Sequence, residues 1–160
     1  MKDFDHPPLK RHESLQPFSR DHFVGLRAAH RLILAADGSP ADAIEANNYF
    51  VQCWNAEIAS HFNEEEELLM PLMTAPEMDQ MRLEHAALRH AAQQAILWTT
   101  ASPPPAQWCR ETGTALHDHI RWEERVLFMA IQNRASPEAL AAIGVVTAEI
   151  EKSRPGLRKR

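Results

Sequence analysis

The chain has 160 residues, which is enough for one domain with a sizeable core and too few for two. Its formal net charge of −5 argues against nucleic-acid binding as the main function. The start carries no apolar signal-peptide region, and no apolar run approaches the roughly 18 residues of a membrane span. We therefore expect a single domain, 1–160, in a cytoplasmic protein with no membrane contact. Cys53 and Cys109 form no CxxC motif and are expected to be buried and unbridged.

Periodic apolar segments separated by proline-containing breaks predict a helical chain without strands. In chain order, the expected helices cover about 19–36, 40–70, 75–100, 105–134 and 137–152. The expected N-caps are Ser19, Ser39, Thr74 and Ser136. Helices of similar length joined by short turns predict an all-α fold, an antiparallel up-down four-helix bundle over about 19–134. A short C-terminal helix and a basic tail, 153–160, follow it.

Each long helix should carry a buried stripe of residues three and four apart. The expected stripes are His22, Leu26, Ala29 and Ile33; then Val51, Trp54, Ile58, His61, Glu65, Leu68 and Leu72; then Met78, Met81, His85, Leu88, Ala92 and Ala95; then Thr112, Leu116, His119, Glu123, Val126 and Ala130. Each stripe is apolar except where it carries a histidine or a glutamate. The polar members are His22, His61, Glu65, His85, His119 and Glu123.

Burying a carboxylate or an imidazole without a partner costs several kcal/mol, so six such groups in one small core need something that neutralises them. Bound cations would do so. The number of residues between each histidine and the turn that joins its helix to the next is similar enough for all four to lie in one layer of an antiparallel bundle. The stripes therefore predict a metal site, with these six residues as ligands.

Two segments repeat one layout, "HFNEEEELLMP" from His61 and "HIRWEERVLFM" from His119. In each, a glutamate follows the histidine four residues later, on the same helical face. With "PFSRDHFVGL" and "RLEHAALR", these segments resemble the four helices of the hemerythrin-like (HHE cation-binding) family, over about 15–135. The resemblance implies a non-haem di-iron site with two iron ions, bridged by Glu65 and Glu123 and with the four histidines as terminal ligands.

The sequence departs from the oxygen-carrying hemerythrins of that family at two points. They have His-x-x-x-His on the third helix, where this chain has Arg89 four residues after His85, and His90 is turned away. They have His-x-x-x-x-Asp on the fourth helix, where this chain has His-x-x-x-Glu. The departures imply fewer histidine ligands, with a position left to water or another carboxylate. They argue against reversible oxygen carriage.

Other polar residues near the motifs have competing interpretations. Glu66 and Glu124 each follow a bridging candidate; we expect a solvated helix face, with hydrogen bonding to a ligand imidazole as the alternative. His30, on a neighbouring face of the first helix, is the alternative to His22 as a metal ligand. The aromatic residues next to the motifs, Trp54, Phe62, Trp122 and Phe128, are expected in the core.

Two functional hypotheses follow from the resemblance. The first is a di-iron protein that binds or senses a small ligand such as oxygen, nitric oxide or peroxide, or senses iron itself. The second is a di-iron enzyme with peroxidase-like or iron-centre repair activity. Since sensor and enzyme would share their ligands, the sequence does not decide between them, and it identifies no protein partner.

Overall fold

The structure is a computed structural model that describes residues 10–153. The helices are, in chain order, η1 (Glu13–Leu15), α1 (Gln16–Ala35), α2 (Pro40–Cys53), η2 (Trp54–Ile58), α3 (Ala59–Glu64), η3 (Glu65–Leu69), η4 (Met70–Leu72), α4 (Ala75–Ala95), α5 (Ala106–Trp122), η5 (Glu123–Leu127), α6 (Phe128–Arg134) and α7 (Pro137–Ser153). The segments η2, η3 and η5 are π-helical, and η1 and η4 are 3₁₀ turns. No strand occurs between residues 10 and 153, so the all-α prediction is confirmed.

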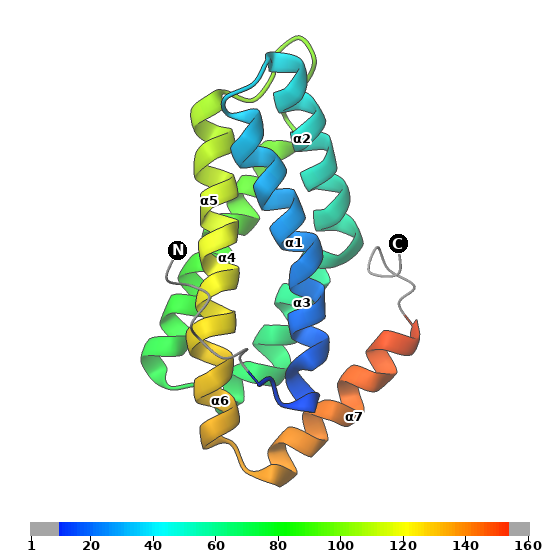
Figure 1. The fold of residues 1–160 in the computed structure, drawn as a ribbon, viewed down its shortest axis with the longest axis vertical. Helices are drawn as coiled ribbons and strands as arrows, with labels where there is room; N and C mark the ends of the chain where they lie inside the picture. Colours follow the sequence, from blue (N-terminus) through cyan, green and yellow to red (C-terminus); the bar gives the residue numbers. More distant parts are fainter. Residues whose placement is uncertain (1–9, 154–160) are drawn as a thin grey trace.

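The long helices form a bundle in which α1 packs against both α5 and α2, and α4 packs against α5 and α2 (Figure 1). The continuous rod of α2, η2, α3 and η3 turns at η4 into α4, and that of α5, η5 and α6 leads into α7. Helix α7 lies obliquely across one end of the bundle, where it packs against η1 (Figure 1). Of the predicted basic tail, 153–160, Ser153 is the last residue of α7 and the rest lies outside the described residues.

Three of the four expected helix starts agree with the structure. Ser39 and Thr74 form capping boxes with Asp42 and Glu77, and the Ser136 hydroxyl accepts a hydrogen bond in the first turn of α7. The expected N-cap at Ser19 is wrong, because α1 begins at Gln16 with proline in its first turn. Proline fits that turn because its missing N–H would have no intrahelical partner there.

The third helix ends earlier than expected, at Ala95 instead of about residue 100. The Asn47 side chain on α2 donates a hydrogen bond of 2.9 Å to the Ala95 carbonyl. This tertiary contact satisfies a carbonyl that the helix end leaves open. Ile96 and Leu97, which follow, are exposed.

The π-helical segments displace the buried stripes by one residue. Val126 was expected in the core but is 54% exposed, and Leu127 is fully buried in its place. A π-helical turn contains about one residue more than an α-helical turn, so the buried stripe shifts by one residue within η5 from the position that α-helical spacing predicts. The same slip buries Leu69, the last residue of η3, instead of Leu68. Upstream of η2 it buries Phe50 in place of Val51.

The apolar core consists of two clusters with a polar layer between them. On α1, Phe18 belongs to one cluster and Val24 to the other, and His22 lies between them. Ile120 and Leu127 flank Glu123 in the same way. Both cysteines are buried and unbridged, as predicted. Within residues 10–153, no helix is both long and apolar enough to cross a membrane.

Candidate metal centre

The six predicted ligands meet in this polar layer. His22 comes from α1, His61 and Glu65 from α3 and η3, His85 from α4, and His119 and Glu123 from α5 and η5. Each residue is at most 4% exposed. The four histidines and two glutamates therefore form one buried cluster.

The cluster divides into two overlapping groups of possible ligands. His22 and His61 form one group with Glu65 and Glu123, and His85 and His119 form another with the same two glutamates. Within each group, one ligand atom from every residue lies within 4.8 Å of the others. Each group thus combines two histidines with the two glutamates that both groups share.

The atoms at the centre of the cluster have no hydrogen-bond partner. These buried atoms are the Nε2 atoms of His22, His61, His85 and His119 and both carboxylate oxygens of Glu65 and Glu123. Each Nε2 lies 2.5–3.5 Å from an oxygen of one of the two glutamates, without hydrogen-bond geometry. Buried donors and acceptors are otherwise almost always satisfied. Imidazole nitrogens and carboxylate oxygens that converge in this way fit metal ions.

The other nitrogen of each imidazole is held by a carboxylate from a different helix. The Nδ1 pairs are His61 with Asp21, His85 with Glu66, His119 with Glu84 and His22 with Glu124, at 2.7–2.9 Å. A carboxylate at Nδ1 keeps a proton on that nitrogen, so Nε2 is the ring nitrogen left to bind a cation. The four pairs close a ring of contacts around the bundle.

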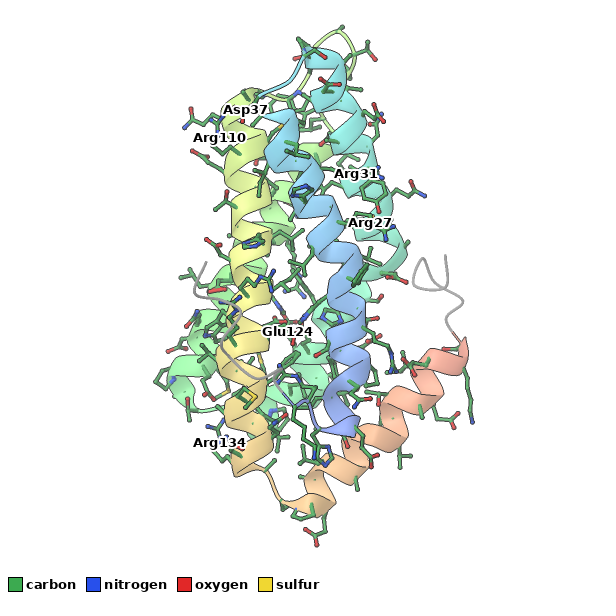
Figure 2. All side chains as sticks on the ribbon, viewed as in Figure 1. Arg27, Arg31, Asp37, Arg110, Glu124 and Arg134 are labelled. Atoms are coloured by element: carbon green, nitrogen blue, oxygen red, sulfur yellow. The ribbon has the colours of Figure 1, made fainter. Side chains whose placement is uncertain are left out.

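Arginines hold two of these carboxylates in turn. Arg89 donates to both oxygens of Glu66, at 2.7 and 3.0 Å. Arg11 donates to the carboxylate and the carbonyl of Glu124, which lies between α1 and the α5–α6 rod (Figure 2). The expected solvated face at Glu66 and Glu124 is therefore wrong, because both side chains turn towards an imidazole on a neighbouring helix.

Phenylalanine rings cover two of the imidazoles. Phe62 stacks on His85 with a centroid distance of 3.8 Å and an interplanar angle of 1°. Phe128 stacks on His22 at 5.5 Å and 12°. Both phenylalanines are buried, as expected. They exclude water from the cluster and restrict rotation of the rings.

The charges within the cluster shift its pKa values. Burial lowers the pKa of His119, but attraction to Glu123 outweighs burial and raises this pKa to about 10. Burial likewise lowers the pKa of His61, but attraction to Glu65 outweighs burial and raises this pKa well above 6.5. Burial raises the pKa of Glu123, yet His119 holds it well below 4.5. In the metal-free protein at neutral pH, the imidazoles of His61 and His119 are thus protonated on both nitrogens, and a bound cation would displace the inward proton.

Sequence reasoning missed two residues of this arrangement. Asp21 and Glu84 hold His61 and His119, although neither was singled out as a site residue. Each stands directly before a predicted ligand, and this repeated acid–histidine pair was the available signal. The substitutes His30 and His90 are exposed and do not join the cluster.

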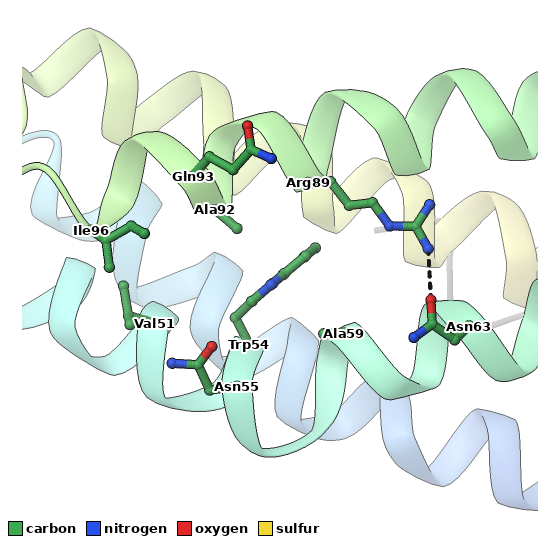
Figure 3. Close-up of a pocket in the computed structure, with 9 residues that line it drawn as sticks. All are labelled: Val51, Trp54, Asn55, Ala59, Asn63, Arg89, Ala92, Gln93 and Ile96. Atoms are coloured by element: carbon green, nitrogen blue, oxygen red, sulfur yellow. Dashed lines mark hydrogen bonds between the residues drawn. The ribbon is translucent and has the colours of Figure 1, made fainter.

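Two hollows lie near the cluster. A small internal cavity of about 10 Å³ is bordered by His22, His61 and His119. An open groove of about 330 Å³ lies between the α2–α3 rod and α4, where Trp54 reaches towards α4 and Arg89 donates to Asn63 (Figure 3). Only the cavity touches the six clustered residues.

A family model described as the hemerythrin HHE cation binding domain matches residues 18–131. This range contains all six clustered residues and the carboxylates at their Nδ1 atoms. Comparison with curated proteins and with solved structures found no significant match.

Proposed function

This chain belongs to the hemerythrin HHE cation-binding family, and we propose that its buried cluster holds two iron ions bridged by Glu65 and Glu123. The observation that carries the proposal is the set of inward-facing Nε2 and carboxylate atoms without hydrogen-bond partners. Histidine with carboxylate is a donor set that suits iron. The division into two groups that share both glutamates supports a pair of ions.

In this proposal each residue has a separate role. His22 and His61 hold one ion, His85 and His119 hold the other, and the two glutamates bridge them. The carboxylates at Nδ1 orient the imidazoles and increase their basicity, and the phenylalanine rings keep the site dry. When bound, an iron pair supplies redox chemistry and open coordination positions.

We further propose that the protein binds a small molecule at this site. Each subsite contains only two histidines and two shared carboxylates, which leaves room for an external ligand in the coordination of an iron ion. The small cavity beside His22, His61 and His119 supports this, since it adjoins both subsites. Oxygen, nitric oxide and peroxide are ligands of suitable size.

The test combines metal loading with ligand binding. Protein produced with iron and purified without chelator should retain iron, and the ferrous form should change its visible spectrum when nitric oxide is added. Glu65→Ala and Glu123→Ala should lose iron and the spectral change, because each removes a ligand of both ions. Glu67→Ala, at an exposed position on the same segment as Glu65, is the matched control. Iron retention in both bridging variants would refute the proposal.

A further inference from the structure

The open groove between the α2–α3 rod and α4 has the size and the lining of a ligand site. Its volume of about 330 Å³ lies within the range of small-molecule pockets, roughly 300 to 1,000 Å³. Trp54 projects from η2 towards Ala92 on α4, and Val51 and Ile96 lie at one end (Figure 3). Ile96 is 68% exposed, so part of this apolar lining is open to solvent. The groove therefore fits a flat apolar molecule that lies against the Trp54 ring.

The polar lining of the groove is rich in hydrogen-bond donors and carries one positive charge. Three amide side chains, those of Asn55, Asn63 and Gln93, accompany the indole N–H of Trp54 and the guanidinium of Arg89. None of the nine described residues that line the groove is acidic. The Arg89 side chain is 37% exposed and lies at the end where it donates to Asn63 (Figure 3). A ligand that matches this lining carries a carboxylate at its Arg89 end.

Arg89 has donors to spare for such a carboxylate. Its Nη1 and Nη2 atoms donate to the two oxygens of Glu66, and Nη2 also donates to Asn63 at 3.0 Å. A guanidinium has five N–H donors, so these three bonds leave two. A second carboxylate can therefore bind Arg89, but it then shares the guanidinium with Glu66.

Two residues of the groove each contact a neighbour of the metal cluster. Arg89 holds Glu66, whose Oε1 lies 2.7 Å from His85 Nδ1. Trp54 packs edge to face on Phe62 at 5.3 Å, and Phe62 stacks on His85 at 3.8 Å. Both routes lead to the same imidazole, in one of the two groups of possible ligands. A ligand that moves Arg89 or Trp54 thus acts on His85.

We propose that the groove binds a small aromatic carboxylate and that this binding and metal binding at His85 weaken each other. The second part rests on the proposed metal pair, whereas the first does not. The carboxylate draws the Arg89 guanidinium away from Glu66 and so loosens the support of His85. A metal ion at His85 conversely fixes Glu66 and, through it, Arg89. Linkage makes the two effects equal in magnitude.

Isothermal titration calorimetry with cinnamate, which joins a flat apolar body to one carboxylate, tests the site in the full chain. The dissociation constant is measured before and after iron loading. Cinnamamide lacks the charge and acetate lacks the ring, so these two serve as comparison probes. We expect saturable binding of cinnamate to the metal-free protein, and at least about tenfold weaker binding of either comparison probe. Iron loading should weaken cinnamate binding at least about fivefold.

Variants of the groove assign the binding to it. Arg89→Gln should weaken cinnamate binding at least about tenfold, because it removes the positive charge and leaves the amide lining. Arg82→Gln, at an exposed position on the same helix, is the matched control and should leave the affinity unchanged. If Arg89→Gln does not fold, Ala92→Phe carries the test, since it fills the groove opposite Trp54 and leaves Arg89 in place (Figure 3).

The outcomes separate the groove from the metal site. Wild-type protein that binds cinnamate no more tightly than cinnamamide would overturn the groove site, and so would an unchanged affinity in both Arg89→Gln and Ala92→Phe. Equal or tighter cinnamate binding after iron loading would overturn the link to His85. A wild-type protein that retains no iron would overturn the proposed function instead, and the titration of the metal-free protein still decides the groove.

Discussion

At the scale of single residues, each histidine of the cluster is constrained at one ring nitrogen and directed inward with the other. The acids that constrain them, Asp21, Glu66, Glu84 and Glu124, each stand next to a clustered residue in the sequence but contact a histidine on a different helix. An isolated helix cannot satisfy this arrangement. The cluster therefore depends on the relative rotation of all four rods.

Removing one of these carboxylates should weaken metal binding without removing a ligand. Glu84 is partly exposed and accepts from His119 Nδ1 at 2.9 Å, so Glu84→Ala should fold normally. We expect its affinity for ferrous iron to fall about 10–100-fold, since loss of such outer carboxylates has that effect in other metal sites. Competition with a chromophoric chelator measures the affinity. An affinity equal to that of Glu67→Ala would contradict the positioning role.

The charges of the cluster predict how the stability of the metal-free protein depends on pH. The pKa of His119 is raised from 6.5 to about 10, so its contribution to the free energy of unfolding is complete below pH 6.5 and is lost as the pH rises through about 10. Circular dichroism should therefore show a lower Tm at about pH 10.5 than at about pH 7. Glu123→Gln, which removes the main attraction, should flatten this difference. A Tm that rises with pH over this interval would contradict the account.

The residues that could be predicted are those whose signal lies within one helix. His61 with Glu65 and His119 with Glu123 are visible as repeated pairs on an expected core stripe. Their expected burial indicates that something, such as a bound cation, must compensate their charge. The roles of Asp21 and Glu84 were not predictable in this way. An acid beside a ligand on one helix reveals nothing about which neighbouring imidazole it reaches.

At the scale of elements, the π-helical segments η3 and η5 begin at the two shared glutamates. Each adds one residue to its turn and so rotates the following part of the rod relative to the preceding part. Capping boxes at Ser39 and Thr74 were predictable because their contacts are local. The π-helical turns were not, because the periodicity of the side chains alone does not determine where the extra residue enters.

Because of this rotation, the residue that is buried after each shared glutamate differs from the one that α-helical spacing predicts. Leu127 is fully buried and Val126 is 54% exposed, the reverse of the predicted stripe. Leu127→Ala should reduce the free energy of unfolding by about 2–5 kcal/mol, because it leaves a cavity in the core. Val126→Ala should change it by no more than about 0.5 kcal/mol. Urea denaturation measures both free energies of unfolding. A larger loss for Val126→Ala than for Leu127→Ala would show that η5 is not π-helical in solution.

At the scale of the whole molecule, the polar cluster lies between two apolar clusters and connects all four rods of the bundle. A cation bound there would stabilise the folded state, since the unfolded chain cannot present the same ligands. The bundle itself was predictable from the helix pattern. The contacts of α7 with η1 and the hydrogen bond from the Asn47 side chain to α4 could not be predicted, because they depend on packing between distant segments.

Metal removal should consequently lower stability. A free metal concentration of 100 times the dissociation constant stabilises a folded protein by about 2.7 kcal/mol. For a chain of this size, such a change corresponds to a Tm difference of roughly 5–10 °C. Differential scanning calorimetry before and after chelation, followed by addition of ferrous iron, measures the loss and its recovery. A Glu65→Ala, Glu123→Ala double variant should show neither.

Anomalous diffraction at the iron edge, from crystals grown without chelator, would show directly whether Glu65 and Glu123 bridge a pair of iron ions. We predict two anomalous peaks between these glutamates, one next to His22 and His61 and the other next to His85 and His119. A single peak, a peak away from the glutamates, or none in an iron-supplemented preparation would contradict it.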